Sequence, residues 1–136
     1  WTVTAVDYSD VALDRGRQKA EALGIGDAVE WICSDLVDFD PTGGAYDLVL
    51  LMFIHLPPAE RRRLLRLATA TLNPGGMILV VGYHPVEVPD DAPPGRMPNR
   101  FTPDEIVAEL DGLRVERAER LELPDAVDTI VRAVRV

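Results

Sequence analysis

The stretch YDLVLLMFIHLPPAERRRLLRLATATLNPGGMILVVG, residues 46–82, decides the fold class. Residues 46–53 form an apolar run of the kind that a strand covered on both faces requires. Residues 77–82 form a second run of the same kind, after a turn-forming Asn-Pro-Gly-Gly sequence. A helical pattern separates the two runs. Strand, helix and strand in this order indicate a parallel sheet covered by helices.

The helix between these strands is predicted from Pro57 and Pro58, which favour a helix start, to about Leu72. One stripe of its surface is apolar and is expected to face the core: Leu64, Leu65, Ala68 and Leu72. The basic residues of the same segment are expected to form a solvated face: Arg61, Arg62, Arg63 and Arg66.

The residues before this stretch repeat the alternation of strand and helix. Residues 2–6 and 28–33 are predicted to be strands. Ser9 is suited to cap a helix over residues 10–23, which Gly24 ends. The chain is therefore predicted to have an α/β fold with a mostly parallel sheet.

The last third of the chain has a different character. Residues 84–101 are rich in proline and poor in core candidates, which predicts a loop over a site. Thr102 is suited to cap a helix that ends near Asp111. Residues 113–123 and 126–136 are predicted to be strands, and the link between them is too short for a parallel crossover. We therefore expect an antiparallel hairpin at the end of the sheet.

Composition limits the possible functions. With 136 residues and 47% hydrophobic residues, the chain is expected to form one domain, residues 1–136. The net charge of -9 argues against a nucleic-acid partner, which would require clustered Lys and Arg. A membrane span and a signal peptide are not indicated, so a cytoplasmic location is expected. A single cysteine, Cys33, and two histidines make a metal site an unfavourable prediction.

Two acidic residues follow predicted strands, where ligands of open α/β sheets bind. Asp7 could accept hydrogen bonds from two ribose hydroxyls, or it could cap the following helix, for which Ser9 is better placed. Asp35 could accept from the exocyclic amine of a purine, with Leu36 as an apolar wall against the ring. It could equally belong to an ordinary Asx turn.

Several stretches together resemble the class I S-adenosylmethionine-dependent methyltransferases. VTAVDYSDVALDRGRQKA and ICSDLVDF are similar to the second and third strand regions of that family, and YDLVLLMFIHLPPAERRRLL and LNPGGMILVV to its fourth and fifth. AVDTIVRAVRV is similar to its last, antiparallel strand. HLPPAERRR and FTPDEIVAEL most resemble small bacterial enzymes of the thiopurine or tellurite-resistance type.

The resemblance implies a Rossmann-like three-layer sandwich and S-adenosyl-L-methionine as the cofactor. It implies cofactor contacts for seven residues: Asp7, Tyr8, Ser9, Asp35, Leu36, Met52 and Phe53. The implied reaction is an in-line transfer of a methyl group to a small-molecule acceptor, in which positioning supplies most of the acceleration. His55 is a candidate base for an acceptor that must lose a proton, because a histidine has a pKa near ~6.5. Packing at the turn before Pro57 is the alternative for His55.

One part of the family pattern is not found. The first strand and its glycine-rich turn would precede Trp1, and in the family's strand order, 3-2-1-4-5-7-6, that strand lies beside the strands at residues 2–6 and 46–53. We expect either that residues precede Trp1 in the intact protein or that another chain fills the position, for example in a homodimer formed by strand exchange. Two other functions stay open: a non-catalytic binding or accessory module, and a nicotinamide-dependent oxidoreductase.

Overall fold

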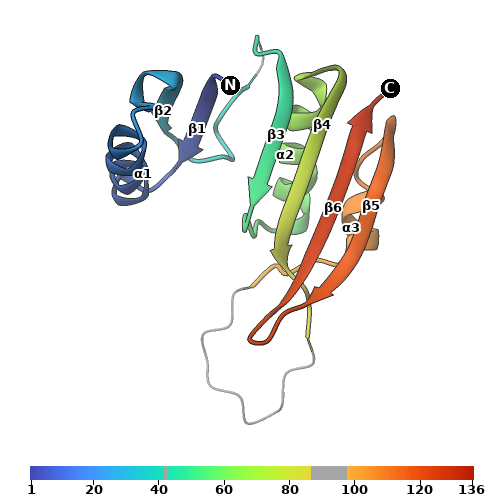
Figure 1. Cartoon of the computed structure of the whole chain (residues 1–136). Helices are drawn as coiled ribbons and strands as arrows, with labels where there is room; N and C mark the ends of the chain where they lie inside the picture. The colour runs from blue at the N-terminus through green and yellow to red at the C-terminus, as the bar shows by residue number, and fades with distance from the viewer. Residues whose placement is uncertain (42, 87–97) are drawn as a thin grey trace. The chain divides into compact units, whose positions relative to one another are not determined.

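A computed structural model of the chain describes residues 1–41, 43–86 and 98–136. These residues form two compact units, Trp1–Asp40 and Pro41–Val136, which we call the N-terminal and the C-terminal unit. Figure 1 labels the helices and strands of both units. The predicted loop at residues 84–101 falls largely on residues 87–97, which lie outside the described residues.

The N-terminal unit is a strand–helix–strand unit. Strand β1 (Val3–Asp7) pairs in parallel with β2 (Val29–Cys33), and helix α1 (Asp10–Ala22) and the 3₁₀ helix η1 (Gly26–Ala28) connect them. As predicted, Ser9 caps α1: the backbone N–H of Ala12 donates to Ser9 Oγ at 3.2 Å. The cap replaces a hydrogen bond that the first turn of a helix lacks, so α1 begins directly after β1.

The C-terminal unit contains a four-stranded sheet in the order β3-β4-β6-β5. The strands are β3 (Tyr46–Met52), β4 (Leu72–Tyr83), β5 (Leu113–Glu122) and β6 (Val127–Arg135). β3 and β4 are parallel, whereas β6 is antiparallel to both β4 and β5. The predicted α/β class and the antiparallel hairpin at the end of the chain are therefore confirmed.

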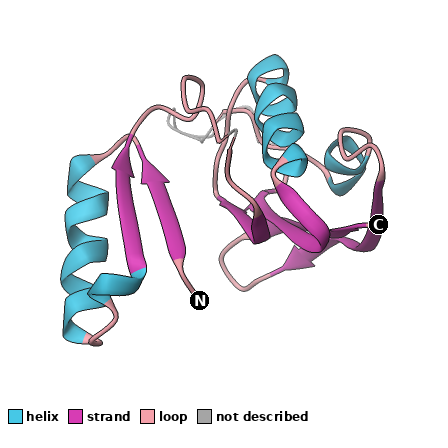
Figure 2. Cartoon of the chain, turned by 90° about the horizontal axis from the view of Figure 1, so that it is seen from above, coloured by secondary structure: helices cyan, strands magenta, loops and turns pink. Residues whose placement is uncertain are grey.

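Helices α2 (Pro58–Ala70) and α3 (Pro103–Val107) lie on one face of this sheet (Figures 1 and 2). Alternate residues of β4 and β6 point to that face, because successive side chains of a strand face opposite sides. The resulting core is apolar: Leu65, Ala68, Leu72, Ile78, Val80, Phe101, Ile106, Leu110, Val131 and Ala133. The core thus holds the four strands in register and fixes the ends of β3, β4 and β6.

Two helix ends differ from the predictions. α2 ends at Ala70 and not near Leu72, because Leu72 is already the first residue of β4 and pairs with Tyr46. α3 ends at Val107 and not near Asp111. The backbone N–H groups of Glu109 and Leu110 donate three residues back, to Ile106 and Val107, which tightens the chain into turns after α3.

The expectation of a solvated arginine face on α2 is wrong for Arg61. Arg62, Arg63 and Arg66 are exposed, but Arg61 is only 7% exposed. Its Nε and Nη2 donate to the two carboxylate oxygens of Glu109 at 3.3 and 3.1 Å. This fork-to-fork geometry supplies the partner that a buried guanidinium requires.

The outer strand β5 carries six charged residues. Arginine and glutamate alternate on it and pair two residues apart, in Arg114–Glu116, Arg117–Glu119 and Arg120–Glu122. β5 is the last strand in the order of its sheet. Among the described residues, no helix is long and apolar enough to cross a membrane.

Candidate functional site

The carboxyl ends of β1 and β2 bring the two predicted acids together in the N-terminal unit. Asp7 is opposite Cys33 in the strand register, and the backbone N–H of Ser34 donates to the Asp7 carbonyl at 3.0 Å. Asp35 therefore follows two residues beyond the partner of Asp7. Both carboxylates lie at the same end of the same strand pair.

Each carboxylate is fixed by a local hydrogen bond. Asp7 Oδ1 accepts from the backbone N–H of Ser9 at 2.8 Å, and Asp35 Oδ1 accepts from that of Val37 at 3.0 Å. Both are Asx-type bonds to the residue two positions ahead, which hold the side chains in one orientation. Within the described part of the chain, the Oδ2 atoms receive no hydrogen bond. The arrangement leaves one oriented acceptor oxygen on each acid.

The other predicted site residues of this unit surround the acids. Tyr8 follows Asp7 and is 80% exposed, and its carbonyl accepts from Cys33 Sγ at 3.7 Å. Ser9 Oγ is used as the helix cap, and Leu36 is half-buried. The Asp10 side chain raises the pKa of the exposed Cys33 thiol, so this thiol stays protonated near neutral pH. The unit therefore presents hydrogen-bond acceptors beside an exposed aromatic ring.

Two of the remaining predicted residues, Phe53 and His55, lie in an aromatic cluster of the C-terminal unit, which Tyr83 and Phe101 complete. The ring centroids of Phe53 and Tyr83 are 5.1 Å apart, and His55 stacks on Tyr83 at 5.2 Å and on Phe101 at 5.6 Å. These distances fall within the range for favourable aromatic pairs. The cluster stands at the carboxyl ends of β3 and β4.

Met52 and Phe53 are half exposed at the end of β3, at 46% and 42%. Phe53 has a φ of 57°, in the left-handed region that few residues other than glycine adopt. Its backbone N–H donates to the Val81 carbonyl at 2.7 Å, which holds this conformation. The chain thus keeps an aromatic ring at a strained position with much of its surface in solvent, a feature that clusters at functional sites.

His55 is held inside the cluster. The backbone N–H of Tyr83 donates to His55 Nε2 at 3.0 Å, so Nε2 carries no proton. Burial lowers the pKa of His55, although the Phe53 carbonyl acts in the opposite direction and Arg100 lowers it further. A proton on Nε2 would break the bond to Tyr83. The geometry therefore favours the packing role for His55 over that of a base.

His84 has the opposite arrangement. Thr129 Oγ1 donates its only hydrogen to the Phe101 carbonyl at 2.7 Å and contacts His84 Nδ1 at 2.9 Å. For both contacts to be hydrogen bonds, Nδ1 must carry a proton and the lone pair of a neutral ring must be on Nε2. Burial lowers the pKa of His84, and the positive charge of Arg120 on β5 lowers it further. The negative charge of Glu105 acts in the opposite direction.

Sequence reasoning missed Phe101 and Thr129 as partners of these histidines. Phe101 is almost completely buried although it ends the proline-rich stretch, and Thr129 is buried on β6. Phe101 is the only phenylalanine, tyrosine or tryptophan of residues 84–101, and this could have indicated from the sequence that it is buried. Thr129 gave none, because its role depends on pairing between distant strands.

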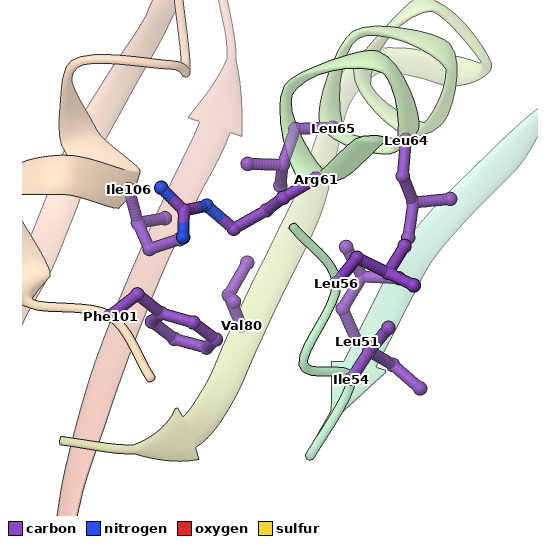
Figure 3. Close-up of a pocket in the computed structure, with 9 residues that line it drawn as sticks. All are labelled: Leu51, Ile54, Leu56, Arg61, Leu64, Leu65, Val80, Phe101 and Ile106. Carbon is purple, nitrogen blue, oxygen red and sulfur yellow. The ribbon is translucent and has the colours of Figure 1, made fainter. Parts of the chain in front are cut away.

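A cavity of about 10 Å³ lies under α2, within the C-terminal unit. Its lining is apolar apart from Arg61, whose side chain extends over the Phe101 ring toward Ile106 (Figure 3). A volume of this size holds about one water molecule. The cavity is a packing defect of the core and is too small for a nucleoside. Among the described residues, no group of His, Cys, Asp and Glu is suited to bind a metal ion.

Comparison with known proteins adds a family to this geometry. Residues 1–76 match the family model described as "Methyltransferase domain", and the match extends over parts of both units. The chain is 29% identical over 79 residues to a carboxy-S-adenosyl-L-methionine synthase from Actinobacillus succinogenes. That alignment covers 58% of this chain and 33% of the relative, so the match spans about a third of the relative's length.

Solved structures show the same fold at low identity. The N-methyltransferase NodS from Bradyrhizobium japonicum, in complex with S-adenosyl-L-homocysteine, has a TM-score of 0.74 and 17% identity, over 97% of this chain and 65% of NodS. TehB from Haemophilus influenzae has a TM-score of 0.79 and 15% identity, over all of this chain and 50% of TehB. These similarities confirm the Rossmann-like fold class.

Proposed function

Because the chain belongs to the methyltransferase domain family, we propose that it is an S-adenosyl-L-methionine-dependent methyltransferase that acts on a small molecule. The observation that carries this proposal is the pair of oriented acids at the carboxyl ends of β1 and β2. An acid at the end of a strand is also expected in a nicotinamide-dependent enzyme, so the acids alone do not separate the two functions. The match to the methyltransferase domain family favours methyl transfer. We further propose that residues 1–136 are parts of one methyltransferase domain.

The acids fit the nucleoside part of the cofactor. Asp7 Oδ2 can accept from the ribose hydroxyls and Asp35 Oδ2 from the adenine amine, while the Oδ1 atoms keep both side chains oriented. Leu36 is suited to pack against the base, and the exposed Tyr8 ring and the Ser9 turn would flank the ribose. Since these acceptors are fixed before binding, little conformational entropy is lost when the nucleoside binds.

When bound, the cofactor supplies an electrophilic methyl group on a sulfonium. The task of this chain is then to orient donor and acceptor and to exclude water. For Met52 and Phe53 we propose cofactor contacts, which rest on the sequence resemblance and on the exposure of both side chains. For the subtype we propose the thiopurine or tellurite-resistance type, which rests on the sequence resemblance, and TehB shares the fold at 15% identity. An acceptor that needs no base agrees with the bonded state of His55 Nε2.

The proposal is tested by titration of the chain with S-adenosyl-L-homocysteine in a calorimeter. We expect saturable binding by the wild-type chain. Asp7→Ala should weaken binding by about 1–3 kcal/mol, because hydrogen bonds to a charged group are lost, and Asp35→Ala should weaken it in the same direction. Asp27→Ala is the matched control. Asp27 is an exposed acid of the same unit, and it lies in η1 before the amino end of β2, whereas the proposed site is at the carboxyl end.

Binding that is equal in Asp7→Ala and Asp27→Ala would remove Asp7 from the cofactor site. Absence of binding by the wild-type chain would argue for the non-catalytic module. A parallel titration with NAD⁺ tests the oxidoreductase alternative, and saturable binding of NAD⁺ that Asp7→Ala abolishes would favour it.

A further inference from the structure

Asp128 is a buried acid that the proposed cofactor site does not use. It is the second residue of β6 and is only 6% exposed. In the strand register it is opposite Tyr83 of β4 on one side and opposite Leu121 of β5 on the other. Its position is thus fixed by two neighbouring strands at the end of the sheet where β4 terminates.

One oxygen of the Asp128 carboxylate lacks a hydrogen-bond partner within the described part of the chain. Its Oδ1 atom is fully buried and makes no hydrogen bond there. Glu109 shows the usual solution, since its side chain is 7% exposed and is bonded by both oxygens to Arg61. A buried carboxylate oxygen without a hydrogen bond lowers the stability of the folded chain, so its presence calls for a partner from outside.

The surroundings of Asp128 indicate what that partner is. Side chains directly opposite each other in antiparallel strands have Cβ atoms about 4.5–5.5 Å apart, so Tyr83 is the cross-strand neighbour of Asp128 on the same face of the sheet. Tyr83 in turn contacts the half-exposed ring of Phe53. Arg100 lies over the Tyr83 ring at 5.3 Å and His55 stacks on that ring at 5.2 Å, so the half-exposed Phe53 ring and the carboxylate are the groups left for a ligand.

We propose that Asp128, Tyr83 and Phe53 form a binding subsite for a protonated amine attached to an aromatic or apolar group. A cation satisfies both the charge and the acceptor atoms of the carboxylate, whereas a hydroxyl satisfies only the acceptors. Aromatic rings favour the same cation. The net charge of -9 also attracts cationic ligands. The amine is then the recognition group of the methyl acceptor, an assignment that rests on the proposed function.

A first experiment separates a binding role from a structural role. Asp128→Asn keeps the shape of the side chain and removes its charge, so we expect the unfolding temperature of the ligand-free chain to rise. Asp125→Asn is the matched control, because Asp125 is an exposed acid of the adjoining turn and its substitution changes the net charge equally. A fall in the unfolding temperature of Asp128→Asn relative to Asp125→Asn would overturn the proposal.

A second experiment measures the ligand class by NMR titration of the 136-residue chain. The probes are 2-phenylethylamine, 2-phenylethanol and 3-phenylpropionate, in which the same phenylethyl group carries an ammonium, a hydroxyl or a carboxylate. We expect the amine to bind best, with shifts at the Tyr83 and Asp128 amides, and Asp128→Asn to weaken amine binding about ten- to a hundredfold. Equal binding of amine and alcohol, or equal amine binding by Asp128→Asn and Asp125→Asn, would overturn the proposal.

The same titrations keep this proposal apart from the proposed function. Asp7→Ala should bind 2-phenylethylamine like the wild-type chain and lose affinity for S-adenosyl-L-homocysteine. A chain that binds the amine through Asp128 and does not bind S-adenosyl-L-homocysteine would refute the methyltransferase and retain the amine subsite. The reverse result would refute the subsite alone.

Discussion

His55 and His84 show how one residue type takes two states in the same unit. The Nε2 atom of His55 accepts a backbone hydrogen bond, whereas the Nδ1 atom of His84 is fixed through Thr129. Protonation of Nε2 therefore breaks an internal bond at His55 and leaves the Thr129 contact of His84 intact. The chemistry open to each histidine follows from its hydrogen bonds and not from its position after a strand.

Both histidines predict a pH dependence of stability. Burial lowers the pKa of each ring from the ordinary value of 6.5, so the unfolded chain takes up these protons first as the pH falls. The contribution of the two histidines to the free energy of unfolding should therefore be complete above about pH 6.5, and the free energy of unfolding should decrease below that pH. Urea denaturation at several pH values between about 8 and 5 measures this dependence.

The variants His55→Gln and His84→Asn isolate the two contributions. The Gln Oε1 atom can accept the Tyr83 N–H in place of Nε2, and the Asn Nδ2 atom can donate to Thr129 in place of Nδ1. Each variant should reduce the loss of stability on acidification. An acid dependence that neither variant changes would assign it to other groups.

At the scale of elements, one buried ion pair connects α2 to the turn after α3. The side chains of Arg61 and Glu109 are 8% and 7% exposed, and Arg61 also lies over the Phe101 ring at 5.6 Å. Removal of one partner leaves an uncompensated buried charge, whereas replacement of both leaves none. The pair therefore fixes the position of the turn more than it adds to the total stability.

This argument predicts a strong coupling between the two residues. Glu109→Ala should lower the free energy of unfolding by about 3–5 kcal/mol, and Arg61→Met with Glu109→Leu should cost less than Glu109→Ala alone. Chemical denaturation of Arg61→Met, Glu109→Leu and the double variant gives the coupling energy. The exposed pair Asp14–Arg17 of α1 is the control, and Asp14→Ala should change stability by less than about 1 kcal/mol. Additive effects of the two core substitutions would contradict the coupling.

The order of elements was predictable from the sequence because apolar runs, proline and glycine act locally. The placement of Asp7 and Asp35 at one end of the strand pair followed from the same patterns, since Asp7 ends β1 and Asp35 lies two residues beyond β2. Arg61 was missed although it shares a helical stripe with Leu65 and Ala68, because its charge favours solvent unless a partner is known. Glu109 and Asp128 could not be assigned roles, since these depend on contacts between residues far apart in the sequence.

At the scale of the whole molecule, the two units have very different cores. Leu13 and Ala20 are the buried apolar residues of the N-terminal unit, and the other described ones belong to the C-terminal unit. Units with few buried contacts open at a small cost in free energy. The part that carries the proposed cofactor acids is thus the less stable one.

Hydrogen exchange should report this difference directly. We expect the amides of β1, β2 and α1 to exchange faster than those of β4 and β6. Addition of S-adenosyl-L-homocysteine should slow exchange in the N-terminal unit, because a ligand that binds only the folded form stabilises it. Equal protection in both units without ligand would contradict the expected difference in local stability.

The alternating charges of β5 bear on how copies of the chain meet. Each of its three Arg–Glu pairs closes within the strand, so a second molecule that stacks along this edge must open those pairs and strip water from six charged groups. The barrier to fibril-like growth at this edge is therefore electrostatic. Concentrated salt would screen these exposed pairs and weaken that protection.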